Sequence, residues 1–449
     1  MRDLTQGPIS GHLLGMAAFI GMGLIFQTLY FIVDLYFVSR LGSAAIAGVS
    51  AAGNVFFIAL AATQLVAVGA MALVSQSVGA RDEAAANTYS DQALSMGLAF
   101  TIAMLVLGYA FGGAFINALT ADEETAAQGR AFLYAYLPSL ALMFPGNAMM
   151  AALRGVGVVM QPMWLQTGTV LLNALLAPVL VVGWGTGVPL GAAGAGLAST
   201  IANVVGFVAL IYLFPRVQTY LRLHWNALAP KLAAWRRILF VGLPTSLEFL
   251  MMFIIIAVTY WAIRDFGADA QAGLGIGGRI MQSIFLPAMA IAFAAGPVAG
   301  QNFGARKYDR VRETFRVTAL IGSAIMLTLT LLCHLNPELM VRPFTDDPEV
   351  VSVGAEYLQI ASWNFVANGL VMAASSMFQG MGDTRPSLIA SATRLVTFAL
   401  PAIWLSFRPG TTLEQFWWLG VASILLQCAI SLTLLFRAFG RKLRPAAAQ

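Results

Sequence analysis

The sequence predicts an all-α integral membrane protein with twelve transmembrane helices arranged as two related six-helix bundles. Three observations predict this class. The 449 residues are 59% hydrophobic and only 10% charged, with a mean hydropathy of +0.79, whereas soluble proteins carry about 25% charged residues. Twelve apolar segments approach or exceed the roughly 20 residues that cross the hydrocarbon core. Loop sequences of the first half also recur in the second half at a constant spacing.

The twelve candidate spans follow one another with short loops, none large enough to be a separate soluble domain. The spans are 12–38, 46–75, 89–116, 128–152, 161–183, 190–214, 238–263, 272–299, 312–335, 350–378, 387–407 and 414–437. The longest break, 215–237, is amphipathic and basic, which predicts a linker at the cytoplasmic membrane interface. This linker would join an N-terminal six-helix bundle, 1–214, to a C-terminal six-helix bundle, 238–449.

The placement of basic residues predicts the orientation. If the N-terminus is inside, 18 of the 25 Lys and Arg residues fall in cytoplasmic segments, five fall in outer loops, and Arg279 and Arg394 lie within spans. This bias follows the positive-inside rule, and it places both termini in the cytoplasm, as an even number of spans requires. The net charge of +5 therefore reflects membrane orientation and is no sign of nucleic-acid binding.

Three loop signatures repeat at an offset of 225 residues. The matching pairs are 41–48 with 266–273, 79–81 (Gly-Ala-Arg) with 304–306, and 154–157 with 379–382. One such match would be an ordinary loop sequence, but three in one register indicate an internal repeat. Six spans in each half give both halves the same orientation. We therefore expect a pseudo-two-fold axis along the membrane normal and a cavity between the bundles.

Four segments carry a resemblance to a known family. They are VDLYFVSRLGSAAIAGVS at 33–50, SQSVGARDEAAAN at 75–87, VAGQNFGARKYDRV at 298–311 and MFQGMGDTRP at 377–386. Their order and spacing resemble the multidrug and toxic compound extrusion (MATE) family, in its bacterial NorM and DinF-like branches, over essentially the whole chain. The resemblance implies twelve helices in two bundles around a V-shaped cavity, and export of small molecules coupled to H⁺ or Na⁺.

Asp34 and Glu248 are the two carboxylates well inside spans, where an ionisable group is costly and usually faces a cavity or a partner. Gln27 and Tyr30 precede Asp34 at i−7 and i−4, so the three share one helical face. The resemblance implies that Asp34 binds the coupling cation and that Tyr30 matches an aromatic residue beside it. The alternative is an interfacial aspartate that reaches for water or pairs with Arg40.

Glu248 lies about ten residues into the seventh span, so roughly 15 Å deep and near the midplane. Pro244 precedes it by one turn and interrupts the backbone hydrogen bonds there. The NorM branch has a glutamate on this helix, but nearer Met252, so its role does not transfer directly. Two readings remain open, a titrating coupling site or a fixed ion pair with Arg394 or Arg279.

Further polar residues lie on neighbouring spans. Asn173 and Thr200 match polar residues near the first-helix Asp in relatives, and Asn147 lies in a similar position on the fourth span. We expect them to orient Asp34 through hydrogen bonds. Ordinary polar packing between helices is the alternative.

Two positions favour proton coupling. Relatives carry an Asp where this chain has Ala177 on the fifth span and Asn368 on the tenth. Each loss removes an oxygen ligand of the kind that Na⁺ prefers, whereas proton carriage needs one titrating carboxyl. We therefore expect H⁺ as the coupling ion in preference to Na⁺.

The predicted substrates are lipophilic, cationic drugs or toxic compounds. The chain has 29 Phe and 20 Met, and such side chains adapt to varied hydrophobic ligands, while buried carboxylates and aromatic rings attract cations. Most of these apolar residues nevertheless face lipid or core, as in any membrane protein. The candidate cavity residues are Gln27, Tyr30, Asn147, Glu248, Arg279, Asn368 and Arg394.

Two alternative functions would require different residues. A flippase for lipid-linked oligosaccharides or polysaccharides, of the same superfamily, is the second hypothesis, because Arg279 and Arg394 would suit phosphate groups. An enzyme is not expected, since the sequence has no HExxH, no Cys/His cluster and no Walker A motif. We expect no cofactor and no metal. We expect a monomer of the bacterial inner membrane whose partners are substrates and lipids.

Overall fold

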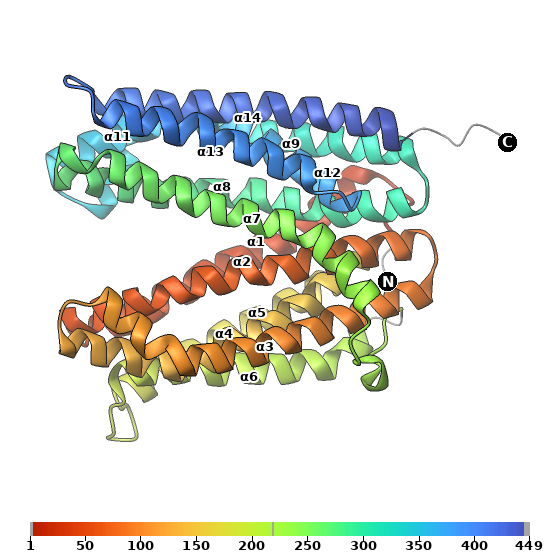
Figure 1. The fold of residues 1–449 in the computed structure, drawn as a ribbon, viewed down its shortest axis with the longest axis horizontal. Helices are drawn as coiled ribbons and strands as arrows, with labels where there is room; N and C mark the ends of the chain where they lie inside the picture. The colour runs from red at the N-terminus through yellow and green to blue at the C-terminus, as the bar shows by residue number, and fades with distance from the viewer. Residues whose placement is uncertain (1–2, 218–219, 444–449) are drawn as a thin grey trace. The chain divides into compact units, whose positions relative to one another are not determined.

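The computed structural model describes residues 3–217 and 220–443, and every regular element in this part is helical (Figure 1). At positions 31, 32, 34, 35 and 217 only the backbone is described. The long helices of the first half are α1 (Ile9–Ser39), α2 (Ser43–Gly79), α3 (Glu83–Leu119), α4 (Glu123–Gly155), α5 (Met160–Val181) and α6 (Gly191–Val217). Those of the second half are α7 (Leu232–Ala262), α8 (Ala268–Gly304), α9 (Tyr308–Leu335), α11 (Pro348–Ala361), α12 (Phe365–Gly380), α13 (Arg385–Ser406) and α14 (Leu413–Lys442).

Short helical segments join some of these helices. They are η1 (Trp225–Ala227), η2 (Arg264–Phe266), α10 (Pro337–Val341), η3 (Arg342–Phe344) and η4 (Ser362–Asn364). In the described residues, 11 helices are long and apolar enough to cross a membrane. The remaining predicted span, 350–378, is covered by α11, η4 and α12 together, so the structure has the expected twelve helical spans.

The tenth span is interrupted by the 3₁₀ turn η4, which contains neither Pro nor Gly to predict it. Side chains of α9 satisfy the altered backbone. The Thr330 hydroxyl donates to the Ser362 carbonyl oxygen at 3.0 Å, and His334 Nδ1 lies 3.2 Å from Ser362 Oγ. Contacts with a neighbouring helix therefore support this turn, and the local sequence gives no sign of it.

Two compact units make up the chain, and they differ from the covalent halves at two helices. The N-terminal unit contains Met22–Gly242, and the C-terminal unit contains Leu4–Gly21 with Leu243–Gln449. The predicted bundles, 1–214 and 238–449, follow the covalent halves instead. In the structure the first part of α1 belongs to the C-terminal unit, and the first part of α7 belongs to the N-terminal unit.

Close backbone contacts hold these exchanged segments in place. In the C-terminal unit, the Leu4 N–H donates to Gln301 Oε1 at 3.0 Å, and Asn302 Nδ2 donates to the Leu4 carbonyl oxygen at 3.1 Å. In the N-terminal unit, a Cβ on Gly242 would lie only 1.7 Å from the Leu65 carbonyl oxygen. The absence of a side chain at Gly242 thus lets α7 pack directly against the backbone of α2.

The Gly-Ala-Arg repeat proves to be a helix cap in both halves. Arg81 and Arg306 follow the ends of α2 and α8 and have φ values of 60° and 57°, in the left-handed region. In each loop the residue after the arginine donates its N–H to the carbonyl five residues back, at 2.9 Å in both. This is the Schellman arrangement that satisfies the last carbonyls of a helix. The predicted internal repeat is therefore confirmed at the level of local structure.

Prolines within α4 are accommodated by side chains of α3. Pro138 and Pro145 have no N–H, so each leaves a carbonyl four residues earlier without its helical donor. Tyr109 donates its hydroxyl to the first of these carbonyls at 3.1 Å, and Thr101 donates to the second at 2.9 Å. Such replacement bonds let an apolar helix keep its prolines without leaving polar groups unsatisfied.

Candidate ion and substrate sites

A buried polar cluster joins α1, α4, α5 and α6 in the N-terminal unit. Asn173 on α5 is fully buried and donates from Nδ2 to the Tyr30 hydroxyl oxygen at 3.3 Å and to Ser199 Oγ at 3.1 Å. One turn after Ser199, Asn203 donates to Ser139 Oγ on α4 at 2.8 Å. We call these five residues the N-terminal polar cluster.

The structure brings together two of the residues predicted to form the coupling site, Tyr30 and Asn173. Asp34 lies one turn beyond Tyr30 on α1, and its side chain is outside the described residues. Thr200 instead donates its hydroxyl to a backbone carbonyl of α4 at 2.6 Å. Gln27 is exposed. The N-terminal polar cluster therefore lies one turn from Asp34, the predicted coupling carboxyl. It contains some, but not all, of the residues that were expected there.

Sequence reasoning missed three members of this cluster, Ser139, Ser199 and Asn203. The sequence offered one signal for these residues, which is that they are polar residues within apolar spans. That signal does not reveal which residues they form hydrogen bonds with. Asn147, which was predicted to be nearby, donates to the carbonyl of Met143 on its own helix at 2.9 Å. Asn147 thus serves local packing of α4 in this structure.

The possible partner of Asp34, Arg40, has its own contacts on α1. The Arg40 guanidinium carbon lies 4.7 Å from the centroid of the Tyr36 ring. The Arg40 Nη2 atom also donates a hydrogen bond to the Tyr36 hydroxyl oxygen. An aromatic residue one turn earlier therefore holds Arg40 by cation–π attraction.

A second polar cluster surrounds Glu248 in the C-terminal unit. The Glu248 carboxyl accepts hydrogen bonds from Ser375 on α12 and Ser387 on α13. Ser387 Oγ lies 3.0 Å from Ser375 Oγ, and Gln379 Nε2 lies 3.4 Å from Ser375 Oγ. Glu248 Oε1 is buried without a hydrogen-bond partner among the described residues. We call these four residues the C-terminal polar cluster.

The fixed ion pair proposed for Glu248 is not present among the described residues. Arg394 Nε is buried without a hydrogen-bond partner there, and the ionisable neighbour of Arg394 is Tyr357. Arg279 is exposed and makes no ion pair within the described part of the chain. Asn368 is half-buried on α12. Glu248 and Arg394 are thus two charged residues of one unit that do not neutralise each other.

The two clusters do not obey the internal repeat. The positions 225 residues after Tyr30, Asn173 and Ser199 are the buried hydrophobic residues Ile255, Phe398 and Ile424. The positions 225 residues before Glu248, Ser375 and Ser387 are Gly23, Met150 and Pro162. Each half thus packs hydrophobic or small residues where the other half carries its polar chemistry.

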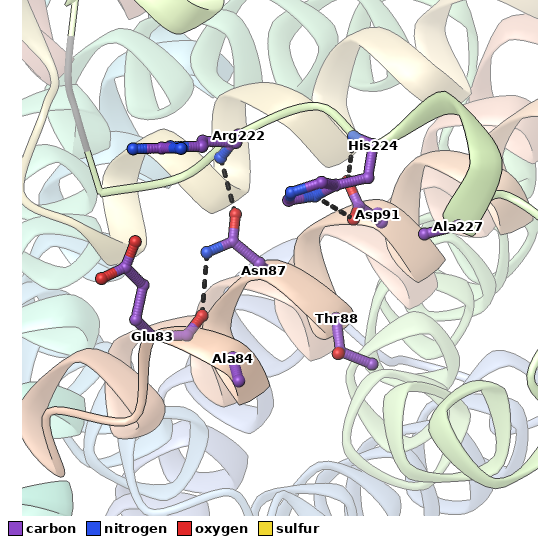
Figure 2. A pocket seen from close by; sticks show the side chains of 8 residues that line it. All are labelled: Glu83, Ala84, Asn87, Thr88, Asp91, Arg222, His224 and Ala227. Atoms are coloured by element: carbon purple, nitrogen blue, oxygen red, sulfur yellow. Dashed lines mark hydrogen bonds and ion pairs between the residues drawn. The ribbon is translucent and has the colours of Figure 1, made fainter.

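A third polar site lies where the segment after α6 packs on the start of α3 (Figure 2). The Asp91 carboxylate is 3% exposed and lies 2.9 Å from His224 Nδ1, and it also accepts from the His224 backbone N–H at 3.3 Å. Beside this pair is a pocket of about 510 Å³ lined by Glu83, Thr88 and Arg222 among others. The predicted linker is therefore fastened to the membrane bundle by buried polar contacts.

Neighbouring residues of α3 strengthen this attachment. Gln92 is fully buried, and its Nε2 donates to the carbonyls of Ala227 and Ala229 at 2.7 and 3.0 Å, while its Oε1 accepts from the Lys231 N–H at 2.7 Å. Burial and the nearby carboxylates of Glu83 and Asp82 raise the pKa of Tyr220. The segment thus has defined hydrogen-bond partners on α3.

Comparison with known proteins identifies the family to which this chain is similar. The MatE family model matches residues 20–179 and 244–405, once in each half. A probable multidrug resistance protein NorM of Bradyrhizobium diazoefficiens is 25% identical over 423 residues, covering 91% of this chain and 89% of that protein. The multidrug export protein MepA of Staphylococcus aureus is 23% identical, covering 86% and 84%.

Solved structures agree on the fold. A structure of a MOP superfamily transporter from Pyrococcus furiosus matches with a TM-score of 0.91 and 22% identity, covering 99% of this chain and 98% of that one. The prediction of a membrane transporter with the MATE-type helical fold is confirmed, as is the expectation that the protein is not an enzyme. Since the family model covers most of both halves, the chain belongs to the MatE family of multi-pass membrane transporters.

Proposed function

We propose that this chain is a secondary active antiporter that exports lipophilic, cationic drugs or toxic compounds in exchange for H⁺. It would work as a monomer in the bacterial inner membrane. Both termini would lie in the cytoplasm, as the distribution of its basic residues indicates. The observation that carries the proposal is the partly buried hydrogen bond between Asn173 and Tyr30, one turn from Asp34. The names of the relatives, which are multidrug resistance and export proteins, support drug export.

In the proposed mechanism Asp34 is the coupling carboxyl. The Tyr30 oxygen accepts a hydrogen bond from Asn173, which directs the phenolic proton away from Asn173. A hydroxyl so oriented on the same helical face can donate to a carboxylate one turn away. Protonation of Asp34 would break this interaction and free α1 to change its packing, which would couple proton uptake to substrate release.

Proton coupling is favoured over sodium coupling by the residues around the cluster. Ala177 lies one turn after Asn173 on α5 and is fully buried, so it supplies no oxygen ligand where relatives have an Asp. Sodium needs several oxygen ligands, whereas a proton needs one carboxyl. Glu248 is the second candidate carboxyl, in the other unit.

Dye transport in proteoliposomes tests the proposal. We would reconstitute the purified protein in proteoliposomes, add the cationic dye rhodamine B ethyl ester outside, impose a pH gradient without sodium, and follow the dye fluorescence. We expect uptake that collapses with the pH gradient and ignores sodium. Asp34→Asn should abolish it, while Asp346→Asn, which removes an exposed loop carboxylate, should leave it unchanged.

Three outcomes would contradict the proposal. Unchanged transport by Asp34→Asn would remove Asp34 from the mechanism. Transport started by a sodium gradient at fixed pH would show sodium coupling. If the dye is not moved under any gradient, while fluorescent lipid-linked phosphates change leaflet, the flippase hypothesis would replace drug export.

A further inference from the structure

We infer that the segment 220–237, between α6 and the first turns of α7, forms a binding surface for the headgroups of anionic phospholipids. Five exposed residues of this segment make up what we call the linker surface: Arg222, Trp225, Lys231, Leu232 and Arg236. Lipid binding here does not depend on drug export or on the identity of the coupling ion.

The charge of this region is strongly positive. No Asp or Glu occurs between Glu124 and Glu248, while 215–237 carries five basic residues. Arg222 and Arg236 are exposed and form no ion pair within the described part of the chain. Of the carboxylates that α3 brings to the pocket beside Arg222, Asp91 is already paired with His224 (Figure 2). Such an excess of positive charge attracts anionic lipid headgroups.

The segment has a buried face and an exposed face of unusual composition. Leu221 and Ala234 are buried within the N-terminal unit. Trp225 is 60% exposed and Leu232 is 78% exposed, on the same segment as the exposed basic residues. Water disfavours such large apolar side chains, whereas Trp and Leu mixed with Arg and Lys are typical of the membrane–water interface. The composition of the linker surface therefore suits the boundary between headgroups and acyl chains.

Hydrogen bonds to α3 fix the depth of the segment. Asn87 Nδ2 donates to the Tyr220 carbonyl oxygen at 3.1 Å, and Ser95 Oγ donates to the Leu228 carbonyl oxygen at 2.6 Å. Asn87 and Ser95 are about 12 Å apart along the helix axis, and the predicted third span begins between them, at residue 89. The segment therefore lies alongside the beginning of this span, where headgroups meet the hydrocarbon core.

The face of α3 that holds the segment continues as an exposed apolar stripe. Ile102 follows Ser95 by seven residues, and Val106 follows Ile102 by one further turn, so the three share one helical face. Both Ile102 and Val106 are exposed within the span, where acyl chains are the solvent. A phospholipid whose chains cover these two residues would place its headgroup next to the segment 220–237.

Quenching of Trp225 fluorescence by brominated lipids tests the inference. We would reconstitute the full-length protein in phosphatidylcholine vesicles with a minor fraction of phosphatidylglycerol. Bromine would be placed on the acyl chains, close to the glycerol, of either the phosphatidylglycerol or an equal fraction of the phosphatidylcholine. The chain has nine Trp, so the difference between each protein and its Trp225→Phe counterpart isolates the Trp225 signal.

Three double variants separate charge from other effects. Arg222→Gln/Arg236→Gln removes two charges from the linker surface, and Arg222→Lys/Arg236→Lys keeps them. The matched control is Arg342→Gln/Arg408→Gln, which removes two exposed arginines from loops at the opposite ends of the helices. All these side chains are exposed, and gel filtration would establish that each variant is folded.

We expect brominated phosphatidylglycerol to quench Trp225 several-fold more than the same fraction of brominated phosphatidylcholine. Arg222→Gln/Arg236→Gln should make the two lipids nearly equal, because each basic residue at an anionic membrane surface contributes about fivefold in affinity. Arg222→Lys/Arg236→Lys and the control should keep the preference of the wild type. The preference should also fall as salt is raised, since salt screens exposed charges.

Equal quenching by the two lipids in the wild type would overturn the inference. Absence of Trp225 quenching by either lipid would do so as well, because it would place the segment away from the membrane. A preference that survives in Arg222→Gln/Arg236→Gln would refute the role of the linker surface. Inorganic phosphate distinguishes the other source of the same chemistry. If it abolishes the preference where chloride of equal ionic strength does not, the ligand is a soluble anion and the lipid assignment is wrong.

Discussion

Gly48 on α2 and Gly129 on α4 are in backbone contact, so that a Cβ on Gly48 would lie 2.6 Å from the Gly129 nitrogen. The repeat reproduces this crossing at Gly273 and Gly354, where a Cβ on Gly273 would lie 3.1 Å from the Gly354 nitrogen. Small residues at such crossings let membrane helices approach closely and gain packing contacts. The repeated segments 41–48 and 266–273 thus each contain a glycine at which two helices are in contact.

Gly48→Ala should destabilise the protein, because the neighbouring atoms are backbone and cannot rotate away. Overpacking of this kind costs about 1–3 kcal/mol. Gly53→Ala, on the same helix, is the matched control, since a Cβ there meets nothing within 4 Å. It should be neutral or stabilise the helix by up to about 1 kcal/mol. Thermal unfolding in detergent measures both, and equal Tm values for the two variants would refute the contact.

Asn173→Leu should uncouple transport without preventing folding. Leucine fills a similar volume but removes the donor to Tyr30 and Ser199, at a cost of about 1–3 kcal/mol for the buried groups left behind. We expect proton-driven dye export to fall at least about tenfold. Asn54→Leu is the control, because Asn54 is exposed and, among the described residues, bonds only to carbonyls of its own helix. Export at wild-type level by Asn173→Leu would separate the N-terminal polar cluster from coupling.

Glu248 and Ser387 should be energetically coupled in a double-mutant cycle. Glu248→Gln and Ser387→Ala each disturb the same hydrogen bond, so their effects on unfolding should deviate from additivity by about 0.5–3 kcal/mol. Ser391→Ala provides the control on the same helix, since Ser391 bonds to Gln427 instead. Its effect should add to that of Glu248→Gln within about 0.5 kcal/mol. Additivity in both cycles would contradict the C-terminal polar cluster.

Gln92→Ala should release the segment after α6 from α3. The variant loses three hydrogen bonds to that segment, so local opening becomes easier. We expect limited trypsin digestion after Arg222 and Lys231 to become several-fold faster. Thr88 lines the same pocket and has no hydrogen bond to the described part of the segment (Figure 2), so Thr88→Ala should be cleaved like the wild type. Slow cleavage of Gln92→Ala would mean that other contacts hold the segment.

Hydropathy and loop chemistry predicted most of the fold because both act locally. A span is read from about 20 consecutive residues, and a Schellman cap from a few residues such as those around Arg81 and Arg306. The predicted spans and repeat were confirmed for this reason. The break at η4 escaped prediction because it depends on Thr330 and His334 of another helix.

The candidate sites were predictable only in part. Asp34, Tyr30, Glu248 and Arg394 stood out because polar groups are rare in apolar spans. Their partners did not stand out, since serines such as Ser199 and Ser387 are common in membrane helices, where a serine hydroxyl can equally donate to a carbonyl of its own helix.

The sequence by itself determined that this is a two-fold repeated, multi-pass membrane protein, because composition, helix length and caps are properties of neighbouring residues. Only the tertiary structure decided that Asn173 meets Tyr30 and that Glu248 meets Ser387 and not Arg394. It also assigned the first parts of α1 and α7 to opposite units. These outcomes depend on which helix faces pack together, and packing joins residues that are far apart in the chain.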